Sequence, residues 1–408
     1  MKKLVLFTLL AGTISYSSHG QSAFSEFTDN PSAFTIGSDK NTLQIGGRIS
    51  FYGEDRFLNS GENNLDHNTV DIKDLDLDII GKTASKFSYE VHYSLVDLAV
   101  AAATQNTNNP FNPGIKASYL QYDGFKIKIK VGYDKLPFSQ NNIEHEHETP
   151  MWGRPVLASG DLFSRRDIGI TLNTSLLKNN MLNLYAGMYS GMGETYFEYG
   201  QDESGKFEYV GRAEFCYPSK MSYNEIDEEN SPILHFRIAG NIRYSDKTGP
   251  LGEGLDAKYP DAVGAYGTRL FDGYRTIYGG DAIIKYRGFS VTFEEDILNM
   301  RPQSQSDPLF NGTPESINKG VVNAGGFITD LNYNWQKIRS VFSVGYENTN
   351  PNDLIPGHME SLTFGYAYKL SGFNSCIKFE YLDPIIADNG SDPLKYYGQI
   401  RLGYQIVF

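Results

Sequence analysis

The sequence predicts an all-β fold, a sixteen-stranded antiparallel transmembrane β-barrel with long external loops and short periplasmic turns. From residue 42 to residue 408, apolar and polar residues alternate with period two, in pieces separated by turn-rich stretches. This alternation is the pattern of strands with two different faces. The chain also holds 28 Tyr, 25 Phe and 41 Gly among 408 residues, which suits many short strands better than helices. Beyond the N-terminus no apolar run has the length of a membrane helix, so a membrane location would require a closed barrel.

Charge and cysteine content exclude several other classes of protein. Lys and Arg total 36 and Asp and Glu total 49, so the formal charge is −13. An acidic chain of this kind argues against a nucleic-acid partner held by a general basic field. Two cysteines are too few for a disulfide scaffold or for a four-cysteine zinc site.

The N-terminus has the pattern of a cleaved signal peptide. Lys2 and Lys3 precede an apolar run from Leu4 to Ile14, and small or polar residues follow up to a plausible cleavage site after Gly20. The alternative is a membrane anchor, but a helix needs ~20 apolar residues to span the bilayer, more than this run offers. We therefore expect a signal peptide at 1–20, an N-terminal periplasmic segment at 21–41 and the barrel at 42–408.

Sixteen alternating segments account for the barrel wall. The clearest runs from Phe125 to Tyr133, where apolar residues share one face and three lysines share the other. An even count agrees with the rule for single-chain bacterial outer-membrane barrels. The segments lie near residues 42–55, 70–81, 86–96, 115–123, 125–133, 166–174, 181–190, 207–217, 232–245, 274–287, 288–298, 319–333, 335–347, 359–370, 374–382 and 394–408.

The connections between these segments alternate in length. Long outer loops and short inner turns are typical of bacterial barrels. The connection around 218–231 is too long for an inner turn, and the pattern offers no explanation for it. The expected external connections are 56–69, 97–114, 134–165, 191–206, 246–273, 299–318, 348–358 and 383–393.

The alternative fold is a soluble β-sandwich, whose strands would also alternate. The C-terminus favours the barrel, because apolar residues alternate there from Ile400 up to a terminal Phe408. An aromatic residue that ends an amphipathic strand resembles the recognition signal of the outer-membrane assembly machinery. That machinery, acting through Phe408, and outer-membrane lipid are therefore expected partners, and the bacterial outer membrane is the expected location.

If the apolar face of each strand meets lipid, the other face lines the lumen. On that face the basic residues outnumber the acidic ones by five, although the chain as a whole is acidic. Because rings of Arg or Lys in a pore select anions, this excess predicts a preference for anions. The alternative is a ladder of paired charges without selectivity, in which Asp74, Asp76 and Asp78 neutralise the nearby lysines. The expected pore-lining, anion-contacting bases are Arg48, Lys126, Lys128, Lys130, Arg212, Arg237, Arg243, Lys285, Arg287, Lys337, Arg339, Lys369, Lys378 and Arg401.

The third external connection, 134–165, is long enough to fold into the bore and narrow it. Arg154 is a candidate constriction residue, and Arg165 and Arg166 lie where the chain returns to the wall. The alternative is an outward lid that packs against neighbouring loops.

Two kinds of chemistry receive little support. His145 and His147 stand among Glu144, Glu146 and Glu148, but no third ligand is fixed by spacing, so we expect no specific metal site. There is no Gly-x-Ser-x-Gly motif, so we expect no enzyme activity and no cofactor.

Three short stretches carry a resemblance to a known family. They read VGYDKLPFS at 131–139, RRDIG at 165–169 and LYAGMYSG at 184–191, and Arg48 after a glycine pair and the closing Phe408 fit the same pattern. On these residues the chain resembles the phosphate-selective porin family of the O and P type. Arg166, Asp167 and the Pro137-Phe138 turn match as structural elements, whereas no motif matches individual wall arginines.

The resemblance implies a sixteen-stranded outer-membrane barrel, usually a homotrimer, with an inward-folded third loop and an interior row of bases that draws anions through. The expected function is thus passive diffusion of small solutes, preferentially anions and including phosphate. The rivals are a non-selective barrel, a non-conducting structural or adhesion barrel, and an outer-membrane enzyme.

Overall fold

The computed structural model describes residues 33–38, 41–57, 67–104, 114–248, 255–310, 319–354, 358–387 and 398–408. The expected signal peptide at 1–20 lies outside these residues. The strands are β1 (Phe34–Ser38), β2 (Asn41–Phe57), β3 (His67–Lys82), β4 (Phe87–Ser94), β5 (Ile115–Tyr122), β6 (Ile127–Lys135), β7 (Arg166–Leu176), β8 (Leu182–Tyr189), β9 (Glu208–Tyr217), β10 (His235–Asp246), β11 (Gly273–Tyr286), β12 (Phe289–Pro302), β13 (Val322–Trp335), β14 (Ser340–Asn350), β15 (Met359–Ser371), β16 (Ser375–Ala387) and β17 (Gly398–Val407).

Short helices lie only in the connections of the described chain. They are α1 (Leu95–Thr104), α2 (Gln140–Ile143), α3 (Tyr196–Tyr199) and α4 (Leu255–Lys258). Single 3₁₀ turns are η1 (Glu146–Glu148), η2 (Val156–Ala158), η3 (Lys178–Asn180), η4 (Gly193–Thr195), η5 (Pro260–Ala262), η6 (Pro308–Phe310) and η7 (Gln336–Ile338). Within the described ranges, none of the helices has both the length and the apolar character that a membrane crossing requires.

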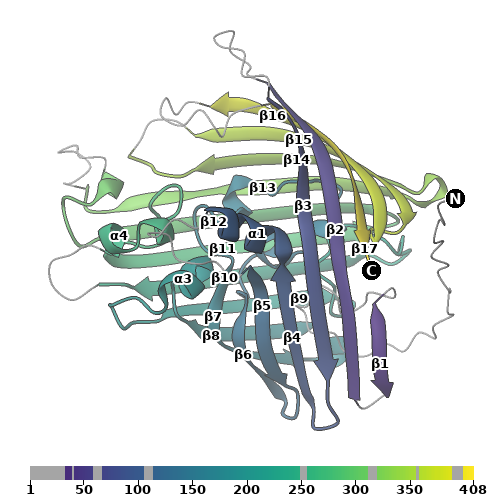
Figure 1. Cartoon of the computed structure of the whole chain (residues 1–408), viewed down its shortest axis with the longest axis horizontal. Helices are drawn as coiled ribbons and strands as arrows, with labels where there is room; N and C mark the ends of the chain where they lie inside the picture. Colours follow the sequence, from purple (N-terminus) through teal and green to yellow (C-terminus); the bar gives the residue numbers. More distant parts are fainter. Residues whose placement is uncertain are drawn as a thin grey trace, which may run out of the picture.

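The strands form a closed antiparallel ring. Each strand from β2 to β16 pairs with the next, β9 pairs with β10 across the longest inner connection, and β17 pairs with β2 (Figure 1). Each of the sixteen segments expected from the sequence overlaps one strand of this ring. The predicted sixteen-stranded antiparallel barrel is therefore confirmed.

The seam of the ring lies between the first and the last wall strands. Gly47 N donates to Phe408 O at 2.8 Å, and Phe408 N donates to Gly47 O at 2.9 Å. A Cβ atom at Gly47 would lie 2.3 Å from Asp76 O, so the close approach of three strands requires glycine. Beyond the seam, β1 pairs with Asn41–Ile45, the part of β2 that lies past the last paired residue of β17.

The wall is apolar on its outer face and polar within, the reverse of a soluble sandwich. On β12, Phe289, Val291 and Phe293 are exposed, while the intervening Ser290 and Thr292 are buried. The same alternation recurs around the ring. An outward apolar face suits acyl chains, and interior charges are kept out of lipid.

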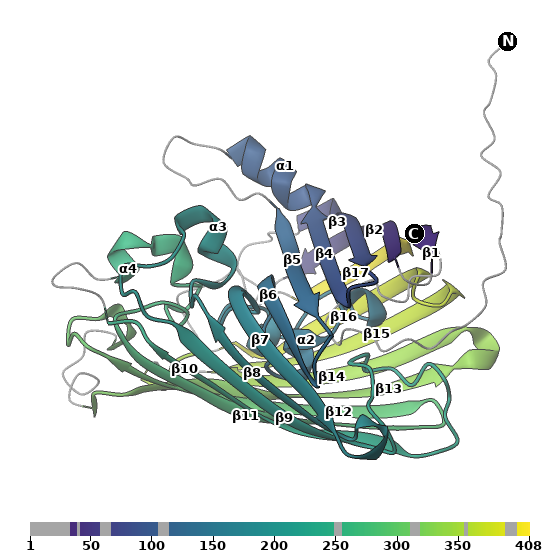
Figure 2. The same ribbon diagram turned by 90° about the horizontal axis from the view of Figure 1, so that it is seen from below.

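The two ends of the barrel differ in their connections. The turns at 83–86, 123–126, 287–288, 336–339 and 372–374 are short and share one end. The long connections emerge at the other end, where α3 and α4 lie close together (Figures 1 and 2).

Candidate functional site

The connection expected to form a constriction folds into the barrel from the end with long connections; its residues 136–165 are called the constriction loop below. Its base is closed by Leu136 N, which donates to Arg165 O at 2.8 Å. Residues 134 and 135, which the sequence assigned to this loop, end β6. The outward lid that the sequence left open is not what the structure shows, because the loop bonds to strands on the far side of the ring.

Three wall carboxylates hold the loop backbone in place. Glu294 on β12 accepts from Asn141 N at 2.8 Å, and Glu380 on β16 accepts from Trp152 N at 2.6 Å. Glu347 on β14 accepts from two successive amides of the loop, Val156 N at 2.9 Å and Leu157 N at 2.7 Å. Such charge-assisted bonds are stronger than neutral ones, so the loop is fixed at three points of the ring.

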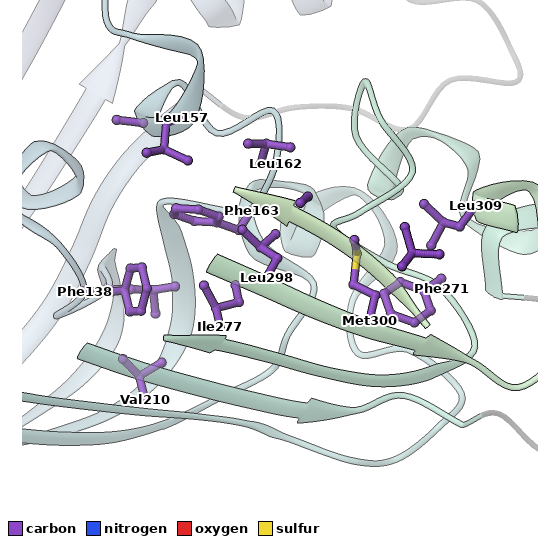
Figure 3. Close-up of a cluster of buried hydrophobic side chains, with 14 of the residues drawn as sticks. Phe138, Leu157, Leu162, Phe163, Val210, Phe271, Ile277, Leu298, Met300 and Leu309 are labelled. Carbon is purple, nitrogen blue, oxygen red and sulfur yellow. The ribbon is translucent and has the colours of Figure 1, made fainter. Parts of the chain in front are cut away.

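An apolar cluster fastens the other side of the loop to the wall. Phe138, Leu157, Leu162 and Phe163 of the loop pack against the inward-facing side chains of β9, β11 and β12 (Figure 3). Val210, Ile277, Leu298 and Met300 supply that wall surface. Held by these hydrogen bonds and by the apolar cluster, the loop occupies one side of the bore.

Charges inside the loop are paired with one another. Arg154 Nε donates to Glu146 Oε1 at 2.7 Å, and Arg165 Nη1 lies 3.6 Å from the same carboxylate. Lys73 of β3 lies 3.4 Å from its other oxygen. Burial alone would raise the pKa of Glu146, but Lys73, Arg154 and Arg165 hold it well below its ordinary value. The third predicted constriction residue, Arg166, is the first residue of β7.

The two histidines of the loop contact bases. His147 Nδ1 lies 3.1 Å from Arg48 Nη1, and His145 Nδ1 lies 3.1 Å from Lys135 Nζ. Cationic neighbours disfavour a metal ion at both rings. In the part of the chain that the structure describes, no three His, Cys, Asp or Glu residues are grouped so as to hold a metal.

The predicted wall bases fall into three groups, and the first is neutralised by acids. Arg48 binds Asp74 at 2.9 Å and Asp76 at 2.7 Å, so these two acids neutralise Arg48 and not the lysines of β6. Lys130 pairs instead with Asp134. The other paired bases are Lys128 with Asp123, Arg212 with Glu214 and Asp281, Arg243 with Glu208, Lys369 with Glu228, and Arg401 with Glu54 and Glu380.

The second group bonds to backbone carbonyls of segments inside the barrel. Arg237 binds Ser222 O, Lys285 binds Ile226 O, and Lys378 binds His147 O. The third group lies in or beside the short turns and is exposed. It comprises Lys126, Arg287, Lys337 and Arg339, which the sequence assigned to strands because the alternation was continued too far into the turns.

An open cavity of about 300 Å³ remains between the loop and the wall from β13 to β17. Met151 and Pro155 border it on the loop side and Tyr346 on the wall side. Its acidic lining residues are Asp161, Asp330, Glu347, Glu360 and Glu380, and its basic ones are Arg154 and Arg401.

Sequence reasoning missed some of the interior charges. Arg275 on β11 bonds to Glu208, and it stands on the same face as Lys285, so the alternation alone could have identified it. Lys73 lies at a register shift of β3, where the partners change from Ser50 with Asp74 to Phe51 with Ile72, and no sequence pattern marks that bulge.

A closed sixteen-stranded barrel with an apolar outer face, a charged interior and an inward-folded loop has the architecture of outer-membrane porins. Residues 43–218 match the family model described as phosphate-selective porin O and P. The resemblance that the sequence motifs indicated is thereby confirmed, and the family and the barrel together imply an outer-membrane location.

Solved structures agree on the fold. OmpF of Salmonella typhi, solved in complex with daunomycin, superposes with a TM-score of 0.55 at 12% identity, covering 92% of this chain and 100% of that chain. OmpT of Vibrio cholerae gives 0.54 at 9% identity, with 92% and 100% covered. The outer membrane channel DcaP of Acinetobacter baumannii gives 0.51 at 11% identity, with 91% and 99% covered. No curated protein has a sequence that matches this chain.

Proposed function

We propose that this chain is a passive diffusion porin of the outer membrane, delivered there by a cleaved signal peptide. The observation that carries the proposal is the open cavity beside the constriction loop. Barrels of sixteen strands leave an aqueous channel, and here the loop fills one side of that channel and leaves the other open. The match to the porin family model and the barrel fold favour a channel over an enzyme.

The charge preference of the pore is the finer part of the proposal. The sequence predicts a preference for anions, phosphate among them, carried by the fourteen wall bases. Of these, only Arg401 lines the cavity, and Arg154 joins it from the loop. An anion path would therefore run past these two guanidiniums, both of which also bind carboxylates.

The cavity lining favours a second candidate, a preference for cations. Five carboxylates face two guanidiniums there, and an excess of one sign concentrates ions of the opposite sign. The two candidates make opposite predictions for the same measurement.

The test is the reversal potential of the purified protein in a planar bilayer under a gradient of potassium chloride. A potential of chloride sign supports the anion preference, and one of potassium sign supports the cation preference. Absence of conductance steps would contradict the porin itself. Repeating the measurement with potassium phosphate examines whether phosphate is carried.

We also propose a homotrimer. One of the solved relatives in fold, OmpT of Vibrio cholerae, is described in a trimer form. Light scattering of the protein in detergent tests the subunit number, and a monomer alone would contradict it.

A further inference from the structure

A second segment folds into the barrel, from the end opposite to the constriction loop. The inner segment, residues 218–231, belongs to the connection between β9 and β10. Other connections at that end are short turns, and this one is the exception that the sequence pattern left unexplained. Tyr223, Glu225, Ile226 and Asp227 are all buried, although no membrane-spanning strand contains them.

The inner segment first bonds to the strands from which it emerges. Tyr223 Oη donates to Glu214 Oε2 of β9 at 2.7 Å. Arg237 Nη1 of β10 donates to Ser222 O at 3.1 Å, and its guanidinium lies 4.3 Å from the centre of the Tyr223 ring. These contacts turn the chain inward immediately after β9.

The inner segment then crosses the bore. Lys285 Nζ of β11 donates to Ile226 O at 3.0 Å, and Asn334 Nδ2 of β13 donates to Asp227 O at 2.8 Å. Gly288 N, in the turn before β12, donates to Asp227 Oδ2 at 2.7 Å. The Ile226 side chain packs against Val341, Ala367, Phe373 and Cys376, which belong to β14, β15, β16 and the turn between the last two. The inner segment therefore reaches from β9 to the strands on the far side of the ring.

Within the barrel the inner segment meets the constriction loop. Glu225 N donates to Glu144 Oε1 at 2.6 Å, and Gln140 Nε2 donates to Tyr223 O. Ile143 of α2 packs with Tyr223 and with Tyr185 of β8. Two segments that enter from opposite ends thus touch in the lumen.

The wall fixes the inner segment rather than leaving it free to swing. Buried backbone groups need partners, and here side chains of β10, β11 and β13 supply them. A link between β9 and β10 requires no such crossing, since neighbouring strands elsewhere at this end are joined by tight turns. What the crossing does change is the width of the bore.

We propose that the inner segment is a second constriction of the pore, in series with the constriction loop, which sets the size limit for solutes at the end with short turns. This inference rests on the proposed porin function. A solute that passes the cavity beside the loop must then pass the inner segment.

The direct test replaces residues 218–231 with Asn-Gly in the full chain, so that five residues, Asn-Gly and 232–234, join β9 to β10. The measurements are single-channel conductance and the entry of polyethylene glycols of graded size into loaded vesicles. Because a sixteen-stranded wall by itself encloses an open channel, conductance should rise about twofold or more and larger polymers should enter. A folded variant with unchanged conductance and size limit would overturn the proposal. A wild-type protein that does not conduct would instead contradict the porin function.

A second experiment keeps the proposal testable if the shortened chain does not fold. The two free, buried cysteines, Cys216 and Cys376, are replaced by serine, and Glu228→Cys is introduced on the inner segment. Thr83→Cys, in the exposed turn between β3 and β4, is the matched control at the same end. A bulky thiol reagent should reduce conductance by half or more in Glu228→Cys only. Equal responses of the two variants would contradict a constriction at the inner segment.

Discussion

The two halves of the barrel interior use charge in different ways. In the covered half, β9–β12, the constriction loop and its apolar cluster lie against the wall, and charges such as Arg243, Arg275 and Glu208 are buried in contact with one another. In the open half, β14–β17, charges such as Glu360 and Arg401 border the cavity. The comparison teaches that a charge on the inner face of a barrel acts on solutes only where no segment covers it. Charges in the covered half are occupied by one another and by the loop, whereas Glu347 and Glu380 of the open half both anchor the loop and line the cavity.

The largest expected effect is on the covered half. Glu208→Gln removes the carboxylate that binds both Arg243 and Arg275 and leaves two buried guanidiniums without an anion. Breaking a buried pair in this way costs about 3–5 kcal/mol of the free energy of unfolding. Urea unfolding of the protein in lipid vesicles measures it. Glu360→Gln in the open half is the control, with a loss of about 0–1 kcal/mol. Equal losses from the two variants would erase the distinction between the halves.

A smaller effect is expected where the open half anchors the loop. Glu347→Ala removes the acceptor for Val156 N and Leu157 N, and each bond to a charged group is worth about 1.5–3 kcal/mol. We expect the loop to detach at this point, with a rise in open-channel current noise while the ring stays folded. Ser361→Ala, which lines the same cavity, is the control. A quiet channel in Glu347→Ala would show that Glu294, Glu380 and the apolar cluster hold the loop without Glu347.

The junction between the loop and the inner segment should respond to pH. Burial and the neighbours Glu228 and Glu144 raise the pKa of Glu148 to about 8. Burial raises the pKa of Glu144 although Arg154 opposes it, and burial with Glu144 raises the pKa of Glu225.

An acid whose pKa is raised in the folded contact favours that contact at low pH. The contact should thus be strongest below the ordinary carboxyl pKa of about 4.3 and weaken as pH rises towards 8. Current noise should increase over this window in the wild type and less in Glu225→Gln. Noise that falls as pH rises would reverse the sign and contradict the assignment.

Selectivity should change by a modest amount when the open half is altered. Glu360→Lys replaces an acid on the cavity wall by a base, a change of two unit charges. Each unit charge at about 4 Å in water contributes about 1 kcal/mol, a factor of about five in ion preference. The reversal potential should shift towards chloride. Arg275→Met, in the covered half, is the control and should leave the reversal potential unchanged. A larger shift of the reversal potential from Arg275→Met than from Glu360→Lys would favour an ion path through the covered half.

The smallest effect is expected at the short-turn end. Lys128 pairs with Asp123 at 3.3 Å, and both side chains are about a third exposed. Lys126 is exposed, so salt screens the attraction of both lysines for anions in the pore. Lys126→Glu with Lys128→Glu should change the ratio of anion to cation permeability less than Glu360→Lys does. A reversal of selectivity in this double variant would restore the wall lysines as the filter.

The strands and their faces could be predicted because lipid imposes one rule on every outward position. The rule fails inside, where Ile277 and Leu298 are apolar because they face the loop rather than lipid. The same holds on β13, where Val322 and Ile328 pack in that cluster.

The pairing of the wall bases could not be predicted, because it depends on register between strands that the alternation does not fix. Arg212 on β9 reaches past β10 to Asp281 on β11 at 2.5 Å, a partner 69 positions away in the chain. The length of the 218–231 connection was visible, but its inward direction depends on contacts with strands and turns between β9 and β16.

The hydrogen bonds between Gly47 and Phe408 lie at the seam, so closure of the whole ring depends on the last strand. Fifteen joined strands would still present two unpaired margins, one along β2 and one along β16, and only the final residues of the chain can occupy both. Removing β17 would therefore open the closed barrel into a sheet with two unpaired edges. Such edges readily pair with a strand of a neighbouring chain.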